Sequence, residues 1–118
     1  HKMNKLVMVG CLNFLLFISF SVFGESFETV ADLNDKCRKA ISENPTIEEV
    51  VMATSCVEYI YGAANVIYLT KMFCPKNFIS KGEMVQIFLD WVATHPGQLS
   101  DPAAAGIIYA MSEAWPCS

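Results

Sequence analysis

Apolar residues in the last third of the chain recur at intervals of three and four, the period of an α-helix with one buried face. The first such stripe is Val85, Phe88, Leu89 and Val92. Before it stands Ser80-Lys81-Gly82-Glu83, a capping box in which hydroxyl and carboxylate satisfy free backbone N–H groups. Pro96 follows, and a proline disfavours the helical conformation in the residue before it. The pattern therefore predicts a helix between Ser80 and His95.

A second apolar stripe follows the turn from His95 to Pro102. Its members are Ala104, Ile107, Ile108, Met111 and Trp115. We expect Asp101 to cap this helix and Pro102 to take its first position, where the missing N–H has no cost. Pro116 ends it. Two helices joined by one short turn predict a helical hairpin at this end of the chain.

An earlier helix is predicted from Phe27 to Ser42, with a weak capping box at Thr29 and Asp32. Its apolar face comprises Val30, Leu33, Cys37, Ala40 and Ile41. The opposite face offers the i,i+4 charge pairs Asp32–Lys36 and Asp35–Lys39. We interpret that charged face as solvent-exposed rather than as a partner contact.

The longest helix is expected to begin at the capping box Thr46-Ile47-Glu48-Glu49 and to run to about Phe73, a length of roughly 40 Å. Gly62 lies in its middle, where glycine costs about 1 kcal/mol relative to alanine. Either a close approach of another backbone or a kink would explain it, and both remain open. The tyrosines Tyr59, Tyr61 and Tyr68 are interpreted as core or core-edge residues rather than a ligand-binding stripe.

The first 24 residues have a different character. A short basic segment, Met3-Asn4-Lys5, precedes an almost wholly apolar run from Leu6 to Phe23, and the small residue Gly24 follows. This pattern predicts a secretory signal peptide, with His1-Lys2 as additions ahead of Met3. The alternative is a retained membrane anchor, since the run is close to the shortest transmembrane helix. Residues 25–118 then predict one all-α domain, a small bundle of about four helices.

Four cysteines remain after the predicted signal peptide: Cys37, Cys56, Cys74 and Cys117. An even number in a small exported domain predicts disulfides, with three possible pairings. The cysteines do not form paired C-x-x-C motifs, and His95 is the only histidine after the signal. The sequence therefore predicts neither a zinc site nor any other cofactor.

The expected domain is acidic, because without Lys2 and Lys5 six Lys and Arg face all twelve Asp and Glu. Nucleic acid is therefore excluded as a partner, since phosphate binding needs clustered positive charge. The sequence also lacks the side chains and motifs that catalysis needs. His95, the only candidate base, stands beside Pro96 at a helix end, and no phosphate-binding loop or metalloprotease motif occurs. We expect a protein that is not an enzyme.

One loop stands out, Cys74-Pro75-Lys76-Asn77-Phe78-Ile79, because it carries two large apolar residues. Loops mostly lie on the surface. Phe78 and Ile79 therefore either close the end of the bundle or project towards a partner, and the sequence does not decide between these alternatives.

Several of these segments together resemble the Rap/Tai-type immunity proteins of bacterial type VI secretion systems. They are Cys56-Val57-Glu58-Tyr59-Ile60-Tyr61-Gly62, Cys74-Pro75, His95-Pro96, Leu99, Pro102-Ala103 and Trp115-Pro116-Cys117. Glu58 stands where that family usually has glycine, and Trp115 where it has phenylalanine. The resemblance extends from Cys37 to Cys117 and depends on the order and spacing of motifs that are individually weak.

The resemblance implies a periplasmic, all-helical and often homodimeric protein, free of the membrane after signal cleavage. It also implies binding and inhibition of a cognate peptidoglycan amidase effector of the papain-like NlpC/P60 type. The alternatives are a non-inhibitory envelope interaction protein, such as a secretion adaptor or chaperone, and a membrane-anchored small helical protein.

The motifs themselves do not identify the partner-binding residues. We favour the loop residues Pro75, Lys76, Asn77, Phe78 and Ile79, because apolar anchors more often carry binding energy. The second candidate is the proline-stiffened turn that holds His95, Gly97 and Gln98. Inhibition would then be steric, by a rigid segment that loses little entropy on binding.

The predicted helices also select one disulfide pairing. Two antiparallel helices joined near Asn44-Pro45 would place Cys37 and Cys56 at similar heights above the turn. Cys74, at the end of the long helix, is then left to bind Cys117. We therefore predict the disulfides Cys37–Cys56 and Cys74–Cys117.

Overall fold

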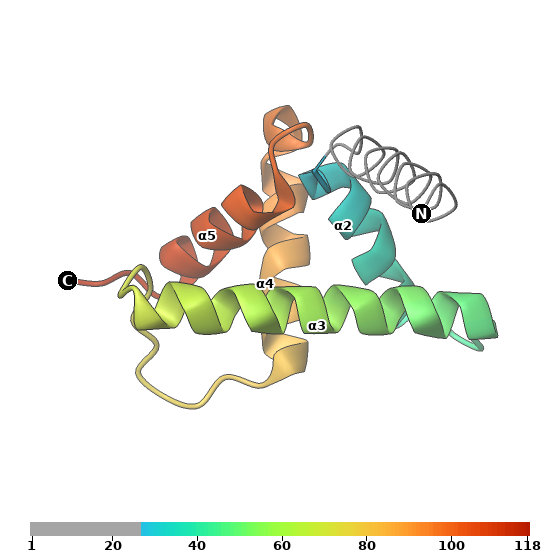
Figure 1. The fold of residues 1–118 in the computed structure, drawn as a ribbon, viewed down its shortest axis with the longest axis horizontal. Helices are drawn as coiled ribbons and strands as arrows, with labels where there is room; N and C mark the ends of the chain where they lie inside the picture. The colour runs from blue at the N-terminus through green and yellow to red at the C-terminus, as the bar shows by residue number, and fades with distance from the viewer. Residues whose placement is uncertain (1–26) are drawn as a thin grey trace, which may run out of the picture.

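A long central helix, α3, supports all the others (Figure 1). The structure is a computed structural model that describes residues 27–118, so the predicted signal peptide lies outside the described residues. The elements are α2 (Val30–Arg38), the 3₁₀ turn η1 (Lys39–Ile41), α3 (Ile47–Leu69), α4 (Lys81–Thr94), the 3₁₀ turn η2 (Pro96–Gln98) and α5 (Ala103–Ala114). Residues 27–118 contain four α-helices and no strand, which confirms the all-α class.

The three predicted capping boxes are all present. In each box the hydroxyl accepts a hydrogen bond from the backbone N–H three residues later. The distances are 3.2 Å at Thr29, 3.2 Å at Thr46 and 3.1 Å at Ser80. In each case the acidic third residue also accepts from the cap's backbone N–H. These local contacts fix the starts of α2, α3 and α4 as the sequence predicts.

The carboxylates of two capping boxes give the fold a pH dependence. The pKa of Asp32 and that of Glu49 lie below their ordinary values of 3.8 and 4.5, chiefly because they accept the backbone N–H groups of Thr29 and Thr46. Their stabilisation is therefore present above the ordinary pKa values and lost as the pH falls through the lowered ones. We expect a smaller drop in melting temperature from about pH 6 to about pH 2.5 for Asp32→Asn/Glu49→Gln than for the wild type. Equal drops, measured by circular dichroism, would contradict this assignment.

Three helix boundaries differ from the prediction. The first helix begins at Val30 rather than Phe27, and its last turn tightens to a 3₁₀ turn after Arg38. The long helix ends at Leu69, before the predicted Phe73, because Lys71 adopts the left-handed conformation with φ 59°. Its 23 residues correspond to roughly 34 Å.

The start of α5 also differs, because Asp101 does not cap it through its side chain. Pro102 is the cap residue and the helix begins at Ala103, whose N–H donates to the carbonyl of Glu28 at 2.8 Å. In return, the N–H of Val30 donates to the carbonyl of Asp101 at 2.9 Å. The two helix starts therefore satisfy each other's backbone groups through contacts distant in sequence.

The buried face of α5 is rotated relative to the prediction. It comprises Ala103, Gly106, Ile107, Ala110 and Met111, whereas Ala104 is exposed. Gly106 explains this rotation, since a Cβ there would lie 2.7 Å from Cγ2 of Val30. At Gly62, the first of the two explanations left open, a close approach of another backbone, does not apply, because nothing lies within 4 Å of a Cβ built there. Figure 1 shows no kink in α3 either.

The core between the helices is formed by fully buried side chains, among which Phe88, Leu33, Ile60, Ile107 and Met111 are the largest. The disulfides are Cys37–Cys56, buried between α2 and α3, and Cys74–Cys117, at the C-terminal end. This is the pairing that the sequence predicts. Each disulfide adds a covalent bond between segments that also contact each other: α2 packs against α3, and the N–H of Cys74 donates to the carbonyl of Trp115.

Tyr59 and Tyr61 are 37% and 38% exposed and so lie at the edge of the core, whereas Tyr68, at 57%, is a surface residue and not the core or core-edge residue that we expected. They lie on the parts of α3 that the other helices leave uncovered.

The charged face of α2 differs from the prediction in its pairing: Lys36 forms a salt bridge with Glu28 rather than with Asp32. Within residues 27–118, no salt bridge joins Asp35 to Lys39.

By length and composition alone, α3 could cross a membrane. In the bundle, however, three contacts hold it to other elements. Cys56 forms a disulfide with α2, Ile60 is fully buried, and the carboxylate of Glu58 pairs with Lys81 of α4 at 3.0 Å. It is therefore the central helix of the fold. The other helices cover one of its faces, and most of the remaining surface is apolar and exposed to solvent.

Candidate functional site

The loop between α3 and α4 is fixed at both ends. At its start, Phe73 is buried, and Cys74 is bonded to Cys117. The N–H of Cys74 also donates to the carbonyl of Trp115 at 2.9 Å. At its end, Ile79 is buried and Ser80 caps α4. The intervening residues 75–78 are therefore held between two anchored points.

Phe78 and Ile79, the two apolar residues of this loop, have opposite environments. The side chain of Phe78 is 91% exposed, whereas that of Ile79 is only 8% exposed and belongs to the core. The two alternatives left open by the sequence thus apply to different residues. Ile79 closes the end of the bundle, and Phe78 projects from it.

Phe78 stands between two surface hollows. One, of about 430 Å³, lies between the loop and α3 and is lined by Tyr61, Tyr68 and Phe73. The other, of about 610 Å³, lies between the loop and the C-terminal segment, against Trp115. The exposed ring of Phe78 therefore continues an aromatic surface formed by α3 and the chain end.

A small charged cluster borders the first hollow. The ammonium of Lys81 lies 3.0 Å from the carboxylate of Glu58 and 4.4 Å from the ring centre of Tyr61. These contacts join the first residue of α4 to the middle of α3. No sequence pattern connects Lys81 with Glu58, because they stand 23 positions apart and only the fold brings them together.

The end of α5 and the C-terminal segment hold the start of the loop in place. The hydroxyl of Ser112 on α5 donates to the carbonyl of Met72 at 2.9 Å. Together with the Cys74–Cys117 disulfide, this contact connects the end of α5 to the start of the loop. Lys76 and Asn77 are exposed, and Pro75 is half-buried. The loop thus presents one apolar and two polar side chains on a braced backbone.

The second predicted segment, the turn with His95, Gly97 and Gln98, lies at the other end of α4. The His95 ring stacks on Trp91 at 4.5 Å between ring centres, and its Nδ1 lies 2.7 Å from the Trp91 carbonyl oxygen. The 14 residues of α4 correspond to about 20 Å, so the structure does not bring the two segments together.

The described residues offer little for catalysis. The only contact of His95 with a carboxylate is a 3.9 Å approach to Glu113. All four cysteines of residues 27–118 are in disulfides, so no thiolate is available in this part of the chain. Within the same range, no group of three His, Cys, Asp or Glu side chains could hold a metal ion. What these residues do present is an exposed apolar surface formed by Phe78 and Tyr68.

Comparisons with known proteins identify the family. A search of curated proteins gives no significant match. Residues 29–117, however, match the family described as Rap1a immunity proteins. The match covers all four helices, both disulfides and the loop that carries Phe78. The chain therefore belongs to the Rap1a immunity protein family.

Proposed function

We propose that this protein protects the cell that makes it against a type VI secretion effector. The effector is a peptidoglycan amidase of the NlpC/P60 class, and the protein binds it in the periplasm as a homodimer of the processed domain, residues 25–118. Family membership, the predicted signal peptide and the two disulfides support an exported inhibitor. The protein has no catalytic part in this mechanism.

The exposure of Phe78 is the observation that carries the proposal. A large apolar side chain that is 91% exposed on a loop with both ends anchored gives up little entropy on binding. An amidase that cleaves peptide stems has a groove for an extended chain. Residues 75–78 enter that groove with Phe78 as the anchor, while Ile79 stays in the core, and the polar side chains of Lys76 and Asn77 lie at its rim.

Phe78→Ala tests this mechanism. Because Phe78 makes almost no contact within the domain, the melting temperature should stay within about 1 °C of the wild type. Affinity for the cognate effector should fall more than tenfold, about 1.4 kcal/mol, since a central anchor is lost. The affinity is measured by calorimetry, and inhibition by an amidase assay on a short peptide-stem substrate.

Two control variants separate the loop from general effects. Phe27→Ala removes another exposed phenylalanine, 88% exposed and outside the loop, just before α2, and should leave affinity unchanged. Ile79→Ala truncates the buried neighbour and should lower the free energy of unfolding by about 2 kcal/mol. If Phe78→Ala binds the effector as tightly as the wild type, occlusion by this loop is wrong.

A further inference from the structure

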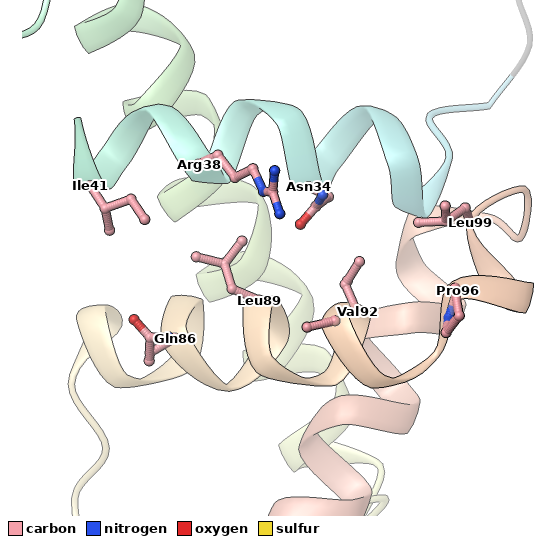
Figure 2. A pocket seen from close by; sticks show the side chains of 9 residues that line it. Asn34, Arg38, Ile41, Gln86, Leu89, Val92, Pro96 and Leu99 are labelled. Atoms are coloured by element: carbon pink, nitrogen blue, oxygen red, sulfur yellow. The ribbon is translucent and has the colours of Figure 1, made fainter.

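A groove between α2 and α4 combines apolar walls with a single positive charge (Figure 2). It has a volume of about 370 Å³. Its apolar lining comes from η1, α4 and the following turn: Ile41, Leu89, Val92, Ala93, Pro96 and Leu99. Its polar side chains are Asn34, Arg38 and Gln86. In Figure 2 the Arg38 side chain runs along α2, and its guanidinium lies beside Asn34 on the side of α2 that faces α4.

Arg38 is the only arginine in the sequence, and the structure gives it no carboxylate partner among residues 27–118. Asp90, one turn beyond Gln86 on α4, already accepts from the Gln86 amide at 2.8 Å. A guanidinium presents several N–H donors in a planar fork that matches a carboxylate. The groove is therefore complementary to an apolar side chain next to an acidic one.

The same chain carries such a pair on an exposed projection. The first turns of α3 extend beyond α2, and their apolar side chains are open: Ile47 is 85% exposed and Val51 62%. Glu48 follows Ile47 directly, is exposed, and forms no salt bridge within residues 27–118. An exposed aliphatic residue beside an unpaired carboxylate is the complement of the groove.

One end of the groove, where Arg38 and Ile41 lie, is close to the projection. The Cys37–Cys56 disulfide ties the residue before Arg38 to α3, and η1 packs against α3. Ile41, 66% exposed, lines the groove and leads into the segment that precedes Ile47. This proximity allows a two-fold arrangement in which each copy gives its projection and receives the other's.

We propose that a second copy of this chain docks here, with Ile47 in the groove and Glu48 paired with Arg38 in both directions. This inference rests on the homodimer of the proposed function and identifies its interface. Each contact occurs twice in such an interface, so one substitution removes two contacts. The Phe78 loop follows the other end of α3 and remains free for the effector.

The test is charge reversal on the processed protein, with the dimer dissociation constant measured by sedimentation. Arg38→Glu and Glu48→Arg should each raise that constant at least 100-fold, through two like-charge contacts. The double variant Arg38→Glu/Glu48→Arg should restore it to within about tenfold of the wild type. Lys71→Glu, an exposed reversal at the opposite end of α3, should leave it unchanged. Arg38→Gln removes the charge and serves as a second variant if reversal disturbs α2.

Several outcomes would overturn the proposal. A wild type that is monomeric at about 100 times the concentration of the inhibition assay has no such interface. If Arg38→Glu or Glu48→Arg alone has the dimer dissociation constant of the wild type, the interface lies elsewhere. A double variant that stays monomeric shows that Glu48 does not occupy the groove. If Arg38→Glu weakens effector binding while dimerisation is intact, the effector occupies the groove. Inhibition by a monomeric variant would overturn binding as a homodimer, while inhibition of the amidase by this protein would stand.

Discussion

Replacing Cys74 and Cys117 by alanine is expected to lower the free energy of unfolding by about 4 kcal/mol. The disulfide joins residues 43 positions apart, and the chain-entropy model gives about this value for a loop of that size. Both half-cystines are exposed, so the loss comes from the released unfolded chain and not from core packing. In a domain of this size, about 4 kcal/mol approaches the whole stability. Denaturant unfolding of the oxidised wild type and of the variant measures this difference in the free energy of unfolding.

The Cys37–Cys56 disulfide is the matched comparison. It closes a shorter loop, with a separation of 19 residues, and should contribute about 3 kcal/mol through chain entropy. Its half-cystines are fully buried, so Cys37→Ala/Cys56→Ala adds a packing loss. Under conditions where both variants are folded, only Cys74→Ala/Cys117→Ala should weaken effector binding, because only that disulfide anchors the Phe78 loop. Equal affinities of the two variants would show that the disulfide does not preorganise the loop.

Features set by neighbouring residues could be predicted from the sequence. The capping boxes at Thr29, Thr46 and Ser80 each join groups three positions apart, so the pattern contains all the necessary parts. The disulfide pairing followed because two helices around one short turn place Cys37 opposite Cys56. The four-helix, all-α architecture results from these local signals together with the helical periodicity.

Features that depend on distant contacts could not be predicted. The N–H of Ala103, at the start of α5, donates to the carbonyl of Glu28, more than seventy positions earlier. The sequence around α5 offers only Asp101 as a cap. The tyrosines of α3 lie on a helix that is apolar on nearly all sides. Periodicity therefore does not show which side the other helices cover. The exposure of Tyr68 follows only from where α4 and α5 pack.

The candidate site was predicted in position but not in detail. The unusual apolar content of the segment from Cys74 to Ile79 identified the loop. Only the fold shows that Ile79 is buried while Phe78 projects, because adjacent loop residues have no fixed period. Arg38 could have been noticed as the only arginine of the chain, but the groove needs α4 beside α2.

Gly106→Val is expected to destabilise the domain by about 3 kcal/mol, at the upper end for overpacked cores. A Cβ at this position would meet Cγ2 of Val30 at 2.7 Å and carbons of the Phe88 and Trp91 rings at 3.4 Å. Val30 is the first residue of α2 and is held by its backbone bond to Asp101, so it cannot withdraw easily. Thermal unfolding should show a fall of more than about 10 °C.

Gly62→Ala is the matched control on α3. The position is helical and exposed, and an added Cβ meets nothing within 4 Å, so alanine should stabilise the domain by about 1 kcal/mol through helix propensity alone. Gly106→Ala gains the same propensity but still places its Cβ against Val30. Its stability should therefore fall below that of Gly62→Ala by the overpacking penalty, about 1–3 kcal/mol. Equal stability of the two alanine variants would mean that α2 can move away from α5. The contact between Val30 and Gly106 would then not determine how these helices pack.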